Sequence, residues 1–330
     1  MTPTLFSMTP QPPPPWQKAM VTAGAGFLGS HLCEHLLDAG VEVDCVDDPS
    51  AGPAHNVGHL AGRPGFRLLE LDLARPGCPD TLAGPYDLVV HFACPAVETV
   101  ARPLETLDAA SLGTRNALAV AERDGARFLL ASTCLLHTDP AGAHTAYDES
   151  QRFAETLTTA YVGAKEADAG IVRVFPAYGP RMGPGDGGVI PGLIRQALTG
   201  GPVTVPGDGS GTPSLCYVDD TVEGMLLVAA SRSVRPVDIG GDHGPTVREI
   251  AGRVLALTGS DARPEFTGAP AEAPEPPAPA TGFAHELFGW TPKVLLDDGL
   301  KRTIAHFTER AAAGSGPPGA EGGVRHACSW

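Results

Sequence analysis

Short apolar runs alternate with longer amphipathic segments over the first half of the chain. The run at 86–92 is almost continuously apolar, which is typical of a strand buried on both faces. We expect strands at 19–22, 41–46, 66–71, 86–92, 127–132 and 170–175, and helices at 30–39, 107–124 and 147–164. Strands that alternate with helices predict an α/β fold with a parallel, doubly wound, Rossmann-type sheet.

A glycine-rich turn joins the first expected strand to the first expected helix. Residues 24–29 read Gly-Ala-Gly-Phe-Leu-Gly. Glycines at this place let backbone amides approach a pyrophosphate, and the helix N-terminus adds a partial positive charge. Asp47 ends the second expected strand, where a carboxylate binds the adenosine ribose hydroxyls and repels a 2′-phosphate. The pattern therefore predicts a dinucleotide site that takes NAD in preference to NADP.

Two weaker features bear on the same site. Asp72 and Leu73 end the third expected strand, where they either contact adenine or form a turn. Tyr147 starts an expected helix, and Gln151 lies four residues later on the same helix face. A lysine at this spacing lowers the phenol pKa and holds the nicotinamide ribose, whereas glutamine forms hydrogen bonds without a charge. The packing alternative for Tyr147 is an aromatic side chain in a cleft wall.

Composition and charge restrict the partners. The net charge of −15 over 330 residues argues against nucleic acid and anionic membranes, because both need a basic face. No apolar run is long enough to span a bilayer, and the N-terminus lacks the basic start and apolar segment of a secretory signal. The seven cysteines are dispersed without metal-ligand spacing. We therefore expect reduced thiols, no metal site and a cytoplasmic protein.

Several motifs together resemble the extended short-chain dehydrogenase/reductases that act on nucleotide sugars. The resemblance covers about residues 18–307 and is greatest to UDP-glucuronate decarboxylases (UDP-xylose synthases), which share Ala-Cys-Pro-Ala at 93–96. The other matching segments are 22–29, 91–96, 130–133, 147–149, 178–182, 216–220 and 288–293.

This resemblance implies a reaction and a set of site residues. In the family, NAD oxidises C4 of UDP-glucuronate, CO₂ leaves from the resulting β-keto acid, and reduction gives UDP-xylose. By position, Tyr147 is the base that takes the C4 hydroxyl proton, Thr133 hydrogen-bonds the same oxygen, and Gln151 stands in the place of the lysine. The expected cofactor-binding residues are Gly24, Gly26, Phe27, Leu28, Asp47, Ser50, Asp72, Leu73, Ala93, Tyr147 and Gln151. The expected substrate-binding residues are Pro95, Thr133, Tyr147 and Arg181.

The resemblance also implies a domain organisation and a homodimer that pairs through a helix bundle including the Tyr147 helix. Residues 17–176 form the expected NAD-binding domain, to which a segment at about 214–250 returns. Residues 177–213 and 251–311 form a smaller, discontinuous α/β domain for the nucleotide sugar. The tails at 1–16 and 312–330 are expected to be unstructured because of their composition.

The chain departs from the family at positions that handle protons. Leu135 replaces a glutamate, His137 a tyrosine and Pro213 an arginine, in addition to Gln151, and Ala23 replaces the first glycine of the cofactor turn. Decarboxylation of a β-keto acid needs little acid–base help, whereas both redox steps depend on Tyr147. The hypothesis is that oxidation and decarboxylation continue while the final reduction is slow, so that UDP-4-keto-pentose leaves.

Alternatives remain at this stage. One is another nucleotide-sugar activity, epimerisation or dehydration, and the other is a non-catalytic protein that binds NAD or a UDP-sugar. Arg181 binds the substrate or clamps two domains together. Asp219 and Asp220 are expected to cap a helix that begins near Thr221, and His91 is expected to be structural.

Overall fold

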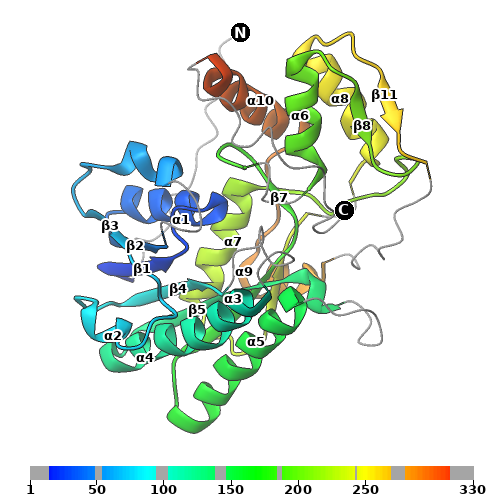
Figure 1. The fold of residues 1–330 in the computed structure, drawn as a ribbon. Helices are drawn as coiled ribbons and strands as arrows, with labels where there is room; N and C mark the ends of the chain where they lie inside the picture. The colour runs from blue at the N-terminus through cyan, green and yellow to red at the C-terminus, as the bar shows by residue number, and fades with distance from the viewer. Residues whose placement is uncertain are drawn as a thin grey trace.

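A seven-stranded parallel sheet forms the centre of the described part of the chain, with the strand order β10-β6-β5-β4-β1-β2-β3 (Figure 1). The computed structural model describes residues 15–48, 54–93, 103–137, 146–183, 188–241, 244–268 and 279–312. The strands are β1 (Lys18–Thr22), β2 (Glu42–Asp47), β3 (Phe66–Glu70), β4 (Leu88–Phe92), β5 (Arg127–Thr133), β6 (Ala169–Val174) and β10 (Val237–Ile239). This is the predicted doubly wound α/β fold.

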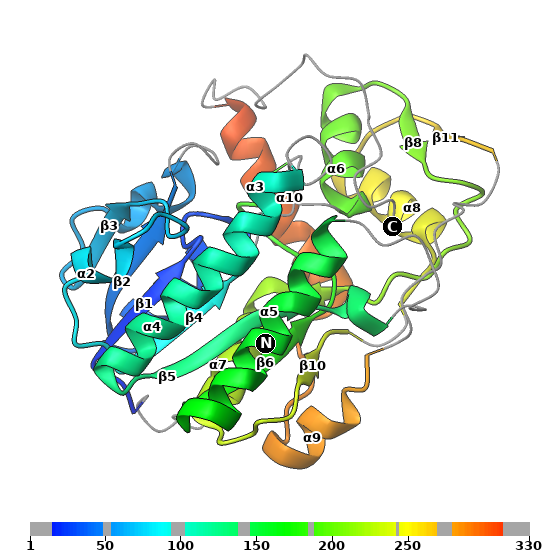
Figure 2. The same cartoon turned by 60° about the horizontal axis from the view of Figure 1, so that its bottom comes forward.

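Helices cover both faces of the sheet, as Figures 1 and 2 show. On one face lie α1 (Phe27–Asp38) and α7 (Val218–Ala230), and on the other lie α4 (Thr114–Asp124) and α5 (Ala146–Lys165). Leu88, Val89 and Val90 of β4 are fully buried because side chains of both orientations meet a helical layer. Two apolar clusters, one on each face, make up the core.

The direction of winding reverses between β1 and β4. β1 pairs with β2 on one side and with β4 on the other, all in parallel. In open sheets of this kind, ligands bind beyond the carboxyl ends of the strands at such a reversal. The glycine turn, which follows β1 directly, therefore lies at the place where a ligand is expected.

A smaller unit packs beyond this edge, at the top of Figure 1. It contains α6 (Val189–Thr199), β8 (Val203–Val205), α8 (Val247–Thr258), β11 (Pro264–Phe266) and α10 (Leu296–Ala312). Thr246 caps α8 by accepting the Glu249 backbone N–H while Glu249 accepts the Thr246 N–H. The short strands β7 (Ala177–Tyr178) and β9 (Cys216–Tyr217) pair with each other.

The remaining elements are short: η2 (Ala54–Leu60), α2 (Cys78–Thr81), α3 (Pro103–Asp108), η3 (Ala109–Gly113), η4 (Cys134–His137) and α9 (Gly282–Phe288). The expected helix at 107–124 is divided, because the π-helical turn η3 separates α3 from α4. α8 crosses the expected boundary at 250 and packs against α6, while α9 packs against β10 of the large sheet. The proposed domain boundaries stay a prediction. Within the described residues, no helix is long and apolar enough to cross a membrane.

The expected start of α7 near Thr221 is wrong by one turn. The helix begins at Val218, so Asp219 and Asp220 lie in its first turn and not at its cap. One carboxylate oxygen of Asp220 instead accepts the backbone N–H groups of Lys293 and Val294, at 2.9 and 2.8 Å. Asp220 therefore ties the segment before α10 to the large sheet's helical layer.

Candidate active site

The turn between β1 and α1 has no room for side chains at its glycines. A Cβ on Gly24 would lie 2.6 Å from Cys45 Sγ, and one on Gly26 would lie 3.2 Å from the carbonyl oxygen of Ala23. A Cβ on Gly29 would collide with the same carbonyl oxygen. Gly26 is exposed and stands immediately before α1, without a side-chain cap. The first-turn amides of α1 are thus open to an anion.

Ala23 has an unfavourable backbone conformation in this turn. It has φ of +47°, in the left-handed region that glycine adopts freely and alanine rarely does. A glycine at this position would adopt the same conformation without the steric penalty of a Cβ atom.

Asp47 is held beside the glycine turn. The Ala25 backbone N–H donates to Asp47 Oδ2 at 2.7 Å, which joins the end of β2 to the turn after β1. Burial raises the pKa of Asp47 above its ordinary value, and the hydrogen bond from Ala25 opposes that shift. A half-buried carboxylate beside the turn fits a contact with two ribose hydroxyls.

The other expected adenosine contacts differ in character. Asp72 accepts the backbone N–H of Ala74 at 2.9 Å and so forms a turn, while its contact with adenine stays a prediction. Leu73 and Ala93 are buried together in the cluster on the α4 face of the sheet. Phe27 is buried and Leu28 half-buried at the start of α1. Ser50 and Pro95 lie outside the described residues.

Thr133 and the Tyr147 helix meet at the carboxyl end of β5. Thr133 is the last residue of β5, and its hydroxyl oxygen accepts the Leu135 backbone N–H at 3.3 Å. Tyr147 lies half-buried in the first turn of α5, which packs against both β5 and η4. Ser150 donates to the Tyr147 carbonyl oxygen at 2.7 Å and steadies that turn. The expected acid–base pair is thus carried by two elements in contact.

Gln151 carries a buried acceptor. The residue is 2% exposed, and among the described residues its Oε1 has no hydrogen-bond partner. A buried unpaired carbonyl oxygen is unfavourable and is expected to be completed by a ligand. A ribose hydroxyl can donate to it. Together with the glycine turn and Asp47, this acceptor fits a bound dinucleotide.

A network of charged side chains lies one helical turn after Gln151 on α5, and it was not predicted from the sequence. Glu155, one turn further along α5, accepts from Ser132 Oγ at 2.7 Å and from Arg173 Nε and Nη2 at 2.9 and 2.8 Å. It thereby fastens α5 to β5 and β6 next to Thr133. The repeat of Tyr147, Gln151 and Glu155 at four-residue spacing was the available signal.

Arg181 joins the segment after β7 to helix α1. Its Nη2 donates to Glu34 Oε2 at 2.6 Å and lies 2.7 Å from His31 Nδ1, both on α1. Its side chain is 11% exposed. Burial, followed by the charge of Arg181, lowers the pKa of His31 to about 3, so this imidazole is neutral and can accept. A role toward substrate stays a prediction.

Leu135 in η4 and Pro213 before β9 are both half-buried. These are the positions at which the sequence resemblance implied a glutamate and an arginine. His137 Nε2 instead lies 3.0 Å from Asp238 Oδ1 of β10. His91 is buried between Thr22 and Thr114 and has its pKa lowered to about 3 by burial, as a structural histidine would. In the described part of the chain, no cluster of three or more His, Cys, Asp or Glu side chains could hold a metal ion.

Comparison with known proteins agrees with this geometry. The NAD dependent epimerase/dehydratase family matches residues 19–240. The chain belongs to that family. Its cofactor is therefore NAD, as the glycine turn and Asp47 predicted.

Within this family, the chain is similar to curated UDP-glucuronic acid decarboxylases. UDP-glucuronic acid decarboxylase 1 of Danio rerio is 35% identical over 88% of this chain and 73% of its own length. UDP-glucuronic acid decarboxylase 6 of Arabidopsis thaliana is 35% identical over 86% of both chains. The crystal structure of UDP-glucose 4-epimerase with UDP-glucose from Thermotoga maritima superposes with a TM-score of 0.80 at 25% identity, covering 89% of this chain and 99% of that one.

Proposed function

We propose that this protein is an NAD-dependent UDP-glucuronate decarboxylase that acts through a 4-keto intermediate and gives UDP-4-keto-pentose, UDP-xylose or both. The observation that carries the proposal is that Thr133 ends β5 and Tyr147 begins α5, which packs against β5, in a chain 35% identical to a curated decarboxylase. The clefts of related folds lie at this edge of the sheet. The nucleotide sugar would therefore lie between the large sheet and the smaller unit.

The residues of this chain have distinct tasks in the proposed mechanism. The glycine turn would hold the pyrophosphate, Asp47 the adenosine ribose and Gln151 the nicotinamide ribose. When bound, NAD supplies the redox chemistry at C4. Thr133 would orient the C4 oxygen by a hydrogen bond, and Tyr147 would take the proton from the C4 hydroxyl. The 4-ketone lies β to the carboxylate and accepts the electrons of the breaking C–C bond, so CO₂ leaves without a further acid from the protein.

The missing partners affect the return step most. Leu135 supplies no acid for protonating C5, and Gln151 supplies no charge beside Tyr147. We therefore expect reduction of the ketone to be slow, and part of the UDP-4-keto-pentose to leave together with reduced cofactor.

Incubation with UDP-glucuronate and NAD, followed by mass spectrometry, tests the proposal. We expect loss of CO₂, a keto-pentose nucleotide and accumulation of reduced cofactor, all abolished by Tyr147→Phe. A new nucleotide sugar of unchanged mass, separated from UDP-glucuronate by chromatography, would identify an epimerase instead. If no CO₂ is lost and no new nucleotide sugar is formed, the protein is a binding protein and the proposal fails.

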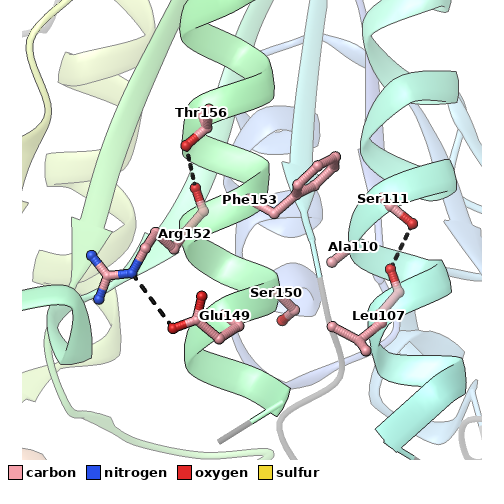
Figure 3. Close-up of a pocket in the computed structure, with 8 residues that line it drawn as sticks. All are labelled: Leu107, Ala110, Ser111, Glu149, Ser150, Arg152, Phe153 and Thr156. Carbon is pink, nitrogen blue, oxygen red and sulfur yellow. Dashed lines mark hydrogen bonds and ion pairs between the residues drawn. The ribbon is translucent and has the colours of Figure 1, made fainter. Parts of the chain in front are cut away.

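A homodimer is part of the proposal, and an apolar groove between α3, η3 and α5 supports it (Figure 3). Leu107 and Phe153, on its two sides, are 40% and 48% exposed, and Leu104 nearby is 72% exposed. The groove has a volume of about 430 Å³. Exposed apolar patches of this kind mark interfaces, and the same helix carries Tyr147. Sedimentation of wild type against Phe153→Glu tests it; a wild-type monomer would contradict it.

A cytoplasmic location is proposed as well. Among the described residues, five buried cysteines form no disulfide, which agrees with a reducing compartment. They are Cys33, Cys45, Cys78, Cys134 and Cys216.

A further inference from the structure

The turn that carries Thr133 is short and needs an external anchor. It consists of the end of β5 and the single 3₁₀ turn η4 (Cys134–His137). Turns of this type have poorer hydrogen-bond geometry than α-helices. Thr133 Oγ1 accepts the Leu135 backbone N–H at 3.3 Å, so the position of η4 decides where the Thr133 hydroxyl proton points. Any shift of η4 would redirect that hydroxyl.

His137, at the end of η4, contacts the far edge of the sheet. Its Nε2 lies 3.0 Å from Oδ1 of Asp238 on β10. Its ring packs against Phe175, with 6.1 Å between the ring centroids. The His137 side chain is 27% exposed and the Asp238 side chain 7%, so water competes only partly for this contact. The bond spans 101 residues of sequence and joins η4 to β10.

Asp238 is a fixed partner. Its second oxygen accepts the Ala280 backbone N–H at 3.0 Å. In the β10–β6 register it pairs with Arg173, whose guanidinium is bound by Glu155 of α5. His137 is thus linked through Asp238 on β10 to Arg173 on β6, and through Arg173 to Glu155 on α5. Glu155 also holds Ser132, the neighbour of Thr133, so the same group of charges fixes both sides of the turn.

We propose that His137 is a positioning residue: its hydrogen bond to Asp238 fixes η4, and through η4 the direction of the Thr133 hydroxyl. His137 acts through Thr133 and needs no contact with the substrate. The inference rests on the proposed function for its kinetic test, because Thr133 acts there on the C4 oxygen. It also makes a structural prediction that is independent of any substrate.

Replacement of His137 separates this role from simple packing. His137→Phe keeps a ring against Phe175 but cannot donate to Asp238. We expect kcat with UDP-glucuronate to fall about tenfold, while KM and NAD affinity stay within about twofold, because small misplacements of a catalytic group lower the rate of chemistry. His137→Gln, whose amide can donate to Asp238, should recover most of the lost rate. An unchanged kcat in His137→Phe would overturn the proposal.

A double-mutant cycle and amide exchange complete the test. Asp238→Asn in the His137→Phe background should add little further loss, since the two side chains act as one unit; full additivity would contradict the proposal. The amides of residues 134–137 should exchange faster in His137→Phe than in wild type or His137→Gln, and equal exchange would overturn it. If wild type does not turn over UDP-glucuronate, the proposed function fails, and the exchange measurement still decides whether His137 fixes η4.

Discussion

Tyr147 and Gln151 lie one helical turn apart on α5, and the buried Oε1 of Gln151 has no hydrogen-bond partner in the part of the chain that the structure describes. In the proposed cofactor complex, the oxygen of Gln151 would accept a hydrogen bond from a ribose hydroxyl. A lysine at this position would place a positive charge one helical turn from the phenol of Tyr147, whereas glutamine places none.

Gln151→Lys should increase the rate of the redox steps. A positive charge one turn from Tyr147 favours the phenolate, and each pKa unit corresponds to about 1.4 kcal/mol, or roughly tenfold in rate. We expect kcat to rise about tenfold and the ratio of UDP-xylose to UDP-4-keto-pentose to increase. Product analysis by mass spectrometry and the absorbance of reduced cofactor measure both.

Gln151→Met is the matched control, since it keeps the volume but neither donates nor accepts strongly. It should weaken NAD binding without increasing kcat. If Gln151→Lys and Gln151→Met have the same rate and product ratio, the charge at this position has no part in the choice of product.

Ala23→Gly should stabilise the protein. Alanine in the left-handed region costs about 1–2 kcal/mol, part of which is offset by the larger entropy of glycine in the unfolded chain. Since φ at this residue is +47°, we expect a net gain of about 1 kcal/mol and an increase in Tm of roughly 2 °C. Calorimetry without NAD measures this. Ala25→Gly, at a neighbouring position without positive φ, is the control, and an equal increase there would contradict the assignment of strain to Ala23.

Asp47→Asn should stabilise the protein without NAD while weakening NAD binding. Burial raises the pKa of Asp47 in the folded state, so the folded protein holds this proton more strongly than the unfolded chain does. The ionised carboxylate therefore destabilises the fold, and this effect is absent at low pH and develops as pH rises through the raised pKa. Asparagine removes it while its oxygen can still accept from Ala25.

Urea unfolding of wild type and Asp47→Asn at pH 4 and pH 7 measures that difference. The advantage of the variant should be larger at pH 7. Titration with NAD and NADP at pH 7 should show weaker NAD binding and reduced discrimination against NADP, because the carboxylate that repels a 2′-phosphate is gone. An advantage that is larger at pH 4 would contradict the sign of the argument.

The fold was predictable because its signals are local. Buried strands such as 86–92 are continuous apolar runs, and the glycine turn must follow a strand and open a helix whatever the rest of the chain does. The expected strands were confirmed to within a few residues. The division of the helix at 107–124 was not predicted, because η3 changes the hydrogen-bond register without interrupting the apolar pattern.

The contacts of the site were less predictable because they are distant in sequence. Arg181 and its partner Glu34 are 147 residues apart, and no pattern near either residue identifies the other. His137 and Asp238 meet only because β10 joins the edge of the sheet beside β6. The residues of the cofactor turn could be identified from the sequence. The partners of individual charged side chains could be identified only after the order of the strands in the sheet was known.

Arg181→Gln should lower stability more than it changes substrate binding. Arg181 is 11% exposed and ion-paired with Glu34, which is 29% exposed, so removal leaves the half-buried Glu34 carboxylate with His59, 3.2 Å away, as its remaining partner. We expect a loss of about 2 kcal/mol in the free energy of unfolding, below the value for fully buried pairs because Glu34 is partly solvated. Glu34→Gln is the matched control, and the double variant should lose little more than Arg181→Gln alone. If Arg181→Gln keeps its stability but its KM for UDP-glucuronate increases more than tenfold, Arg181 binds the substrate and is not a clamp.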